Sequence, residues 1–219
     1  MDTIAAQDAV VALEGGVAGG ADGPTSAQRL AMRDAAPGES RKDDERAVLD
    51  CIAALDHRGA ISLCARTLGA PLGRLCYAML GAQGEADEAV QETLLAAYDS
   101  IASFRGEGSV RSFLYGIARR ICAKRLEVRT RQARRTRVLA ATPEADDASP
   151  DALVDDARRG HAVRAALAEL RPTEREAVLL RFESDLSYRE VGAACGIDEA
   201  AARQRVGRAL AKLRERLGA

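Results

Sequence analysis

The sequence predicts an all-α protein of two small helical domains joined by a flexible acidic linker, the C-terminal domain being a helix-turn-helix. Apolar residues recur at helical spacing from Asp43 onward, whereas valine and isoleucine nowhere alternate with polar residues over a strand's length. Alanine, the strongest helix former, supplies much of the 47% hydrophobic content. An acidic, proline-containing stretch separates the two periodic regions, which places a linker between two domains.

Composition divides the chain into four segments. Residues 1–42 are rich in alanine and glycine and have few large apolar side chains, so we expect this extension to be disordered. Residues 43–137 and 159–219 carry the helical periodicity and are expected to form the two domains. Residues 138–158 contain the run ATPEADDASPDALVDD, which has six carboxylates, two prolines and no basic residue, and we expect a flexible linker there.

The first domain is expected to contain several short helices followed by an acidic one. Three apolar stripes are separated by His57-Arg58-Gly59 and by Gly69-Ala70-Pro71, which predicts three helices. The next helix should turn four apolar residues inward: Val90, Leu94, Tyr98 and Ile101. Its outer face then carries Asp87, Glu88, Gln91 and Glu92. Taken alone, such a face is typical of a solvated helix start, where carboxylates complement the helix dipole.

Basic and aromatic residues concentrate in the following stretch. Between residues 104 and 137 there are eleven arginines and lysines against two glutamates, in a chain of net charge −1. The glycine-bearing loop SFRGEGS precedes a helix on which Arg111, Tyr115 and Arg119 share an outward row. A charge run is usually a solvated face, but acidic partners are scarce here. The pattern therefore predicts a surface that binds phosphates and stacks exposed bases.

The last domain shows the signals of a helix-turn-helix. Thr173 with Glu176, and Ser187 with Glu190, have the spacing of capping boxes. Gly196-Ile197-Asp198 predicts a tight turn before a longer basic helix, an order found in helix-turn-helix units, although other three-helix bundles carry similar caps. The solvent-facing side of that helix presents small residues, which permit close approach, and side chains that read base edges. These are Ala200, Ala201, Arg203, Gln204, Arg205 and Arg208.

Several other classes of protein find little support. The five cysteines are scattered without a CxxC pair, so we expect buried thiols in a reducing cytoplasm rather than a disulfide framework or a metal site. His57 and His161 are the only histidines, and no P-loop is present, so we expect neither an enzyme nor a cofactor. No apolar run approaches about 18 residues, so we expect no membrane insertion.

Two stretches resemble a known family. These are EADEAVQETLLAAYDSIASFRGEGSVRSFLYGIARRICAKRL and LRPTEREAVLLRFESDLSYREVGAACGIDEAAARQRVGRALAKLRERL. In this order they are similar to bacterial RNA polymerase sigma factors of the extracytoplasmic-function (ECF) group of the sigma-70 family. The resemblance implies that residues 43–137 are a region 2-like domain and residues 159–219 a region 4-like domain. It further implies a subunit that directs core RNA polymerase to promoters of a stress or envelope-signal regulon.

The resemblance also implies a role for each surface. The acidic face, Asp87, Glu88, Gln91 and Glu92, is expected to dock on the β′ clamp helices of core polymerase. The melted −10 element is expected to be read by Phe104, Arg105, Arg111, Tyr115 and Arg119, with Arg120, Lys124 and Arg125 holding phosphates. The helix-turn-helix is expected to read the duplex −35 element and to place part of its surface on the β flap. An anti-sigma factor is a further expected partner.

Some positions differ from the commoner family pattern. Phe113 stands where tryptophan is frequent, and the recognition turn DEAAARQR lacks small hydroxyl residues, which affects the promoter sequence expected rather than the class. An alternative function is a stand-alone helix-turn-helix regulator that acts without being a polymerase subunit. That alternative leaves the acidic face and the basic, aromatic segment without a role.

Overall fold

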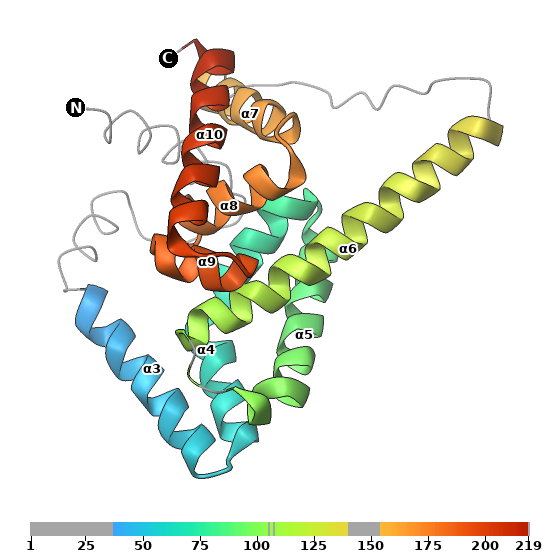
Figure 1. The fold of residues 1–219 in the computed structure, drawn as a ribbon. Coiled ribbons are helices and arrows are strands. Elements are labelled where there is room, and N and C mark those ends of the chain that lie inside the picture. The colour runs from blue at the N-terminus through green and yellow to red at the C-terminus, as the bar shows by residue number, and fades with distance from the viewer. Residues whose placement is uncertain (1–36, 105, 107, 140–153, 219) are drawn as a thin grey trace.

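The computed structural model describes residues 37–104, 106, 108–139 and 154–218, and within these ranges the regular structure is entirely helical (Figure 1). The predicted all-α class is therefore confirmed. Most of the predicted N-terminal extension and linker lies outside the described residues. The elements are α3 (Pro37–Ala53), α4 (His57–Leu80), α5 (Gln83–Ser100), the 3-10 turn η1 (Ile101–Ser103), α6 (Val110–Leu139), α7 (Val154–Ala168), α8 (Pro172–Phe182), α9 (Tyr188–Cys195) and α10 (Glu199–Leu217).

Helices α3, α6 and α7 extend beyond the boundaries that composition predicts, α6 by only two residues, to Leu139. The first, α3, already begins at Pro37, within the segment expected to be disordered, and α7 begins at Val154, within the expected linker. The first turns of α3 consist largely of charged residues. The apolar face that follows carries Val48, which is buried. Burial of that face supports a helix whose first turns are polar.

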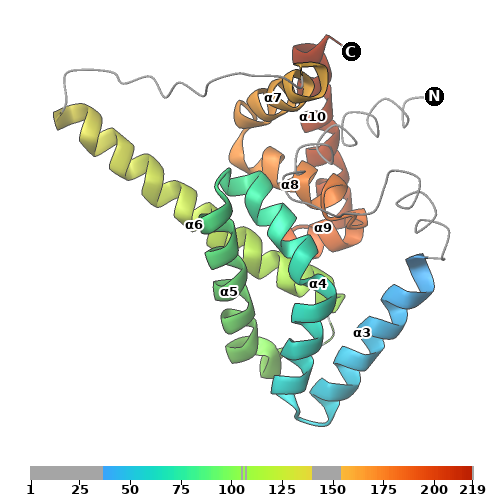
Figure 2. The same ribbon diagram turned by 180° about the vertical axis from the view of Figure 1, so that it is seen from behind.

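Helices α4, α5 and α6 form the body of the first domain, and α3 leans against α4 (Figures 1 and 2). A tight connection joins α3 to α4, where the Asp56 side chain accepts a hydrogen bond from the Gly59 backbone at 2.8 Å. At the other end of the domain, Glu45 of α3 accepts a hydrogen bond from the Val110 backbone N–H at 2.8 Å. Since the first N–H groups of a helix lack partners within it, Glu45 ties α3 to the start of α6.

The predicted break at Gly69-Ala70-Pro71 is wrong, because α4 runs without interruption from His57 to Leu80. Pro71 lies inside the helix and removes one backbone donor. Leu72 and Leu75, just beyond the proline, are fully buried. Burying a leucine contributes about 1.5–3 kcal/mol, so the packing of these two leucines offsets the hydrogen bond lost at Pro71.

The C-terminal domain contains the predicted helix-turn-helix in α8, α9 and α10. Ser187 caps α9 in a full capping box with Glu190, as predicted. Gly196 then adopts a left-handed conformation (φ 69°), and Asp198 caps α10 by accepting from the Ala201 N–H. The other predicted capping box is wrong: Arg171 is the N-cap of α8 and makes no side-chain cap. Proline at the first helical position already suits a helix start without one.

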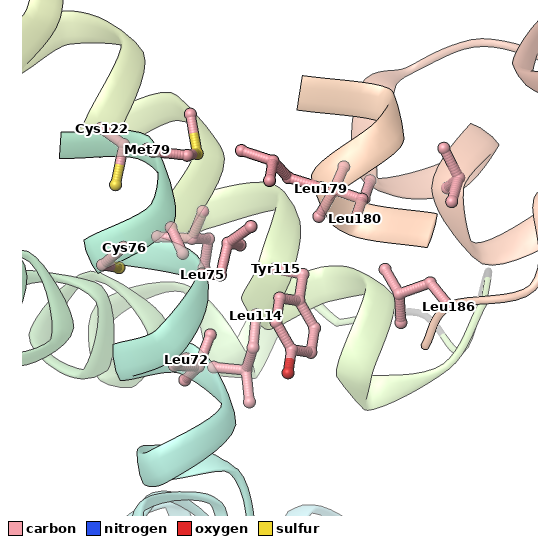
Figure 3. Packing of buried hydrophobic residues seen from close by; sticks show 14 of the residues in the cluster. Leu72, Leu75, Cys76, Met79, Leu114, Tyr115, Cys122, Leu179, Leu180 and Leu186 are labelled. Carbon is pink, nitrogen blue, oxygen red and sulfur yellow. The ribbon is translucent and has the colours of Figure 1, made fainter. Parts of the chain in front are cut away.

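One buried apolar cluster runs through both domains (Figure 3). Tyr115 of α6 lies within it, between Leu114 of its own helix and Leu186 of the C-terminal domain. The cluster also contains Leu72, Leu75, Met79, Leu179 and Leu180. Helix α9 packs on α6, and α8 on α4 and α6. The two domains are thus in direct contact in this structure.

Candidate polymerase and promoter interfaces

The four residues predicted for docking lie on one exposed side of α5. Asp87, Glu88, Gln91 and Glu92 are all exposed, since Ala86, Ala89 and Thr93 take the buried positions of the helix. Because the opposite side is packed against α4 and α6, these four residues form a rigidly held acidic surface.

Two residues that the sequence did not assign to this surface extend it. Leu95 is 68% exposed and Tyr98 is 49% exposed, whereas Tyr98 was predicted to face inward. The small residues Ala86, Ala89 and Ala97 pack inward and bring the helices close, which leaves no room for the phenol ring. The spacing of the alanines along α5 is the signal that indicates the true buried face.

Arg125 links the acidic surface to α6. Its guanidinium donates to Glu88 at 2.9 Å and to Glu92 at 3.1 Å. The hydrogen bond from Arg125 to Glu88, and then the one to Glu92, raise the pKa of Arg125, so the group is held in its charged form. Arg125 was predicted to hold phosphates, but in this structure it is engaged by the predicted docking residues.

The loop before α6 and the first turn of that helix each place one aromatic ring beside a small pocket. Phe104 and Phe113 are half-buried, with ring centroids 5.3 Å apart and planes inclined at 56°. They line a pocket of about 230 Å³ together with Arg120, which is exposed, and Ala193 of α9. Arg105 of the same predicted set lies outside the described residues. An aromatic pair next to a cation is the arrangement that stacks an unpaired base while holding its phosphate.

The row Arg111, Tyr115 and Arg119 does share one face of α6, but that face packs on the C-terminal domain. Tyr115 is fully buried, which corrects its predicted place on an outward row. Burial raises the pKa of the Tyr115 hydroxyl, and the neighbouring Arg111 partly opposes this. Arg111 donates to the Ser184 carbonyl at 2.7 Å, and Arg119 donates to the Ala194 carbonyl at 3.2 Å. Farther along α6, Lys124 is exposed and free to meet phosphate.

The recognition helix α10 keeps most of its predicted DNA-binding face open. Ala200, Arg203, Gln204 and Arg208 are exposed, and Ala201 and Arg205 are half-buried. The Arg203 guanidinium lies 4.6 Å from the centre of the Tyr188 ring and 2.9 Å from the Glu199 carboxylate. Glu199, which by itself would repel phosphate, is therefore neutralised by its neighbour.

The described part of the chain has neither a cluster of metal-ligating side chains nor a helix suited to a membrane. No group of three or more histidine, cysteine, aspartate or glutamate side chains there is arranged to bind a metal ion. Among the same residues, no helix has both the length and the apolar composition needed to cross a bilayer. All five cysteines are free thiols, three of them buried.

Comparison with known proteins places these surfaces in a family. Residues 65–134 match the family described as Sigma-70 region 2, and residues 160–213 match Sigma-70, region 4. The ECF RNA polymerase sigma factor SigE of Mycolicibacterium smegmatis is 31% identical over 151 residues, covering 66% of this chain and 56% of SigE. SigC of Mycobacterium tuberculosis is 33% identical over 138 residues, covering 60% of this chain and 70% of SigC. The chain thus spans between about half and two thirds of the length of these relatives.

Solved structures share the fold. The sigma factor RpoE of Bartonella quintana, crystallised with the anti-sigma factor NepR, superposes with a TM-score of 0.54 at 24% identity, covering 71% of this chain and 94% of RpoE. CnrH, solved with the cytosolic domain of CnrY, gives a TM-score of 0.56 at 22% identity, covering 80% of this chain and 97% of CnrH. The paired region matches and the coverage of SigC show that the chain belongs to the ECF group of the sigma-70 family of RNA polymerase sigma factors.

Proposed function

We propose that this protein binds core RNA polymerase and directs transcription initiation at specific promoters of a stress or envelope-signal regulon. The observation that carries the proposal is the exposure, on one chain, of both an acidic α5 surface in region 2 and a face of α10 in region 4 that presents Ala200, Gln204 and arginines. A stand-alone regulator needs only the second. The polymerase would supply all of the chemistry, and the protein would work in the cytoplasm, where the polymerase is.

Each surface has a proposed partner. Asp87, Glu88, Gln91 and Glu92, continued by Leu95 and Tyr98, would dock on the β′ clamp helices, because carboxylates around an apolar centre suit a basic groove with an apolar floor. The pocket beside Phe104 and Phe113 would take an unpaired base of the −10 strand, with Arg120 and Lys124 on its phosphates. Helix α10 would read the −35 duplex, and part of the same domain would lie on the β flap. An anti-sigma factor is a further proposed partner.

The function is tested by run-off transcription with purified core polymerase on a genomic template library. We expect defined transcripts that appear only when this protein is added. The double variant Asp87→Arg and Gln91→Arg should abolish them, because it cancels the negative charge of the docking surface without changing the residues of the Arg125 ion pairs. Asp50→Arg, an equally exposed change on α3, should transcribe normally. Tight promoter-specific duplex binding without core, and no transcript with it, would instead identify a stand-alone regulator.

The −35 assignment predicts a position-specific defect. Gln204→Ala should cost about 1–3 kcal/mol at one or two upstream base pairs, since it removes hydrogen bonds to base edges. Transcription from promoters altered one −35 base pair at a time measures the effect. Arg214→Ala changes an exposed residue several turns farther along α10 and serves as the control. Uniform loss across all −35 sequences would show that Gln204 contacts only the DNA backbone.

A further inference from the structure

A small cavity lies where α3, α4, the start of α6 and the connection between α8 and α9 meet. Its volume is about 130 Å³, and residues of all four segments line it. This is about the volume of four waters in the liquid, which is enough for a molecule of a few heavy atoms and too little for a nucleotide. The cavity shares no lining residue with the pocket beside Phe104 and Phe113.

Most of the charged side chains around the cavity already have a partner. Arg41 pairs with Asp185 at 2.7 Å, and Arg74 pairs with Glu183 at 3.3 Å. Glu45 accepts a hydrogen bond at 2.8 Å from the backbone N–H at the start of α6. A ligand in the cavity would therefore have to compete for these five groups.

One cation and one anion of the lining have no ion pair with the described residues. Arg111 is half-buried, and its hydrogen bond to the Ser184 carbonyl at 2.7 Å leaves its buried Nε–H without a partner. Asp44 of α3 is also half-buried, and no described residue forms an ion pair or hydrogen bond with its carboxylate. Charges held partly away from water are costly to leave unpaired. The cavity thus presents one unmatched charge of each sign.

Two neutral polar groups of the lining also lack their usual partners. Ser184 is only 3% exposed, and its hydroxyl has no hydrogen bond. Pro71 has no N–H, so the carbonyl oxygen of Thr67, four residues earlier in α4, lacks its helical donor. All three residues line the cavity. Because buried polar groups in proteins are nearly always hydrogen-bonded, a molecule in the cavity would complete both.

We propose that the cavity binds a small apolar amino acid in its zwitterionic form. The ligand carboxylate would accept from the Arg111 Nε–H and the Ser184 hydroxyl, and the ligand ammonium would donate to Asp44 and to the Thr67 carbonyl. The apolar part of the lining, which includes Val48, suits a short aliphatic side chain.

A ligand with a single charge fits the lining less well. A simple anion would leave Asp44 unmatched, and a simple cation would leave Arg111 unmatched. Because Arg111 belongs to the first domain and Ser184 to the second, the amino acid would touch both domains. The contact between them would then respond to the concentration of the free amino acid.

Binding is measured by isothermal titration calorimetry on the full chain, with glycine, L-alanine and L-valine as probes. Acetate and methylammonium each carry one of the two charges and are titrated at the same ionic strength. We expect saturable binding of at least one amino acid, and binding at least about tenfold weaker for either singly charged ion, because each loses one charge-assisted pairing. If acetate binds as tightly, the cavity is an anion site and the inference is wrong. If no probe binds, water fills the cavity and the inference is equally wrong.

Three variants locate the site, with the probe that binds best. Asp44→Asn and Ser184→Ala should each weaken binding about tenfold or more. Asp43→Asn makes the same change of charge at a fully exposed neighbouring position of α3 and should bind as the wild type does. Equal affinities of Asp44→Asn and Asp43→Asn would overturn the inference.

Ser184→Ala also separates a ligand contact from a structural role. It removes a buried hydroxyl that has no partner, so without ligand the variant should melt no lower than the wild type. Weaker binding at undiminished stability is the result expected of a ligand contact, whereas a lower melting temperature without ligand would assign Ser184 to the fold and contradict the inference. These measurements use neither polymerase nor DNA, so their outcome is independent of the proposed function.

Discussion

Tyr115→Ala is expected to lower the free energy of unfolding by about 3–5 kcal/mol. The Tyr115 ring is fully buried in the cluster that joins the two domains, between Leu114 and Leu186 (Figure 3). Removing the ring leaves a cavity between α6 and the C-terminal domain, and the surrounding side chains can fill such a cavity only in part. Chemical denaturation followed by circular dichroism measures the loss.

Tyr115→Phe separates the ring from the hydroxyl. This variant keeps the packing of the ring and should leave the free energy of unfolding unchanged or slightly higher, because the buried Tyr115 hydroxyl has no hydrogen-bond partner among the described residues. A large loss of stability in Tyr115→Ala and little or none in Tyr115→Phe would show that the volume of the ring, and not its hydroxyl, stabilises the fold. If Tyr115→Ala instead keeps its stability and loses binding to single-stranded DNA, Tyr115 faces outward and stacks on a base, as the spacing of Arg111, Tyr115 and Arg119 predicts.

Gly192→Ala should destabilise the helix-turn-helix by about 1–3 kcal/mol. An added β-carbon would lie 2.7 Å from the Ile197 carbonyl oxygen and 3.2 Å from the Asp198 carbonyl carbon and oxygen. These are backbone atoms of the turn, so they yield only if the start of α10 moves. The Asp198 cap on α10 would move with them, and −35 recognition should fall in the same variant.

Gly207→Ala is the matched substitution with the opposite expected sign. Gly207 is also helical and has no atom within 4 Å of an added β-carbon. Alanine there should stabilise the protein by about 0.5–1 kcal/mol, because glycine loses more conformational freedom on folding. Thermal denaturation of the two variants compares them directly. If both variants change the melting temperature by the same amount, the turn tolerates a side chain at Gly192 and the close backbone atoms do not destabilise it.

The parts of the structure that sequence predicted well are those determined by neighbours along the chain. The capping box of Ser187 and Glu190, the turn at Gly196 and the exposed face of α10 all follow from spacing within about ten residues. The acidic residues of α5 do lie on an exposed face, but they were placed there opposite Val90, Leu94, Tyr98 and Ile101, and of these Tyr98 is 49% exposed.

The parts that sequence missed depend on what packs against a helix from elsewhere. Arg111, Tyr115 and Arg119 lie on one row, as their spacing requires, but spacing does not tell whether water or another domain covers the row. Glu176 has capping-box spacing from Thr173, yet its carboxylate pairs with Arg119, which is 57 residues away. Gly69-Ala70-Pro71 predicts a break from its local sequence, but α4 continues through it because apolar contacts with other helices support it there.

The uninterrupted course of α6 has a consequence for how its side chains are spaced. The helix has no break between Val110 and Leu139, so each residue adds about 1.5 Å along a single axis. Arg111 and Arg135 are then about 36 Å apart along the axis and about 120° apart around it. A single-residue deletion near Lys124 would rotate every later arginine by about 100° around the axis. Because no loop within α6 absorbs such a change, the helix should tolerate substitutions along its exposed side far better than insertions or deletions.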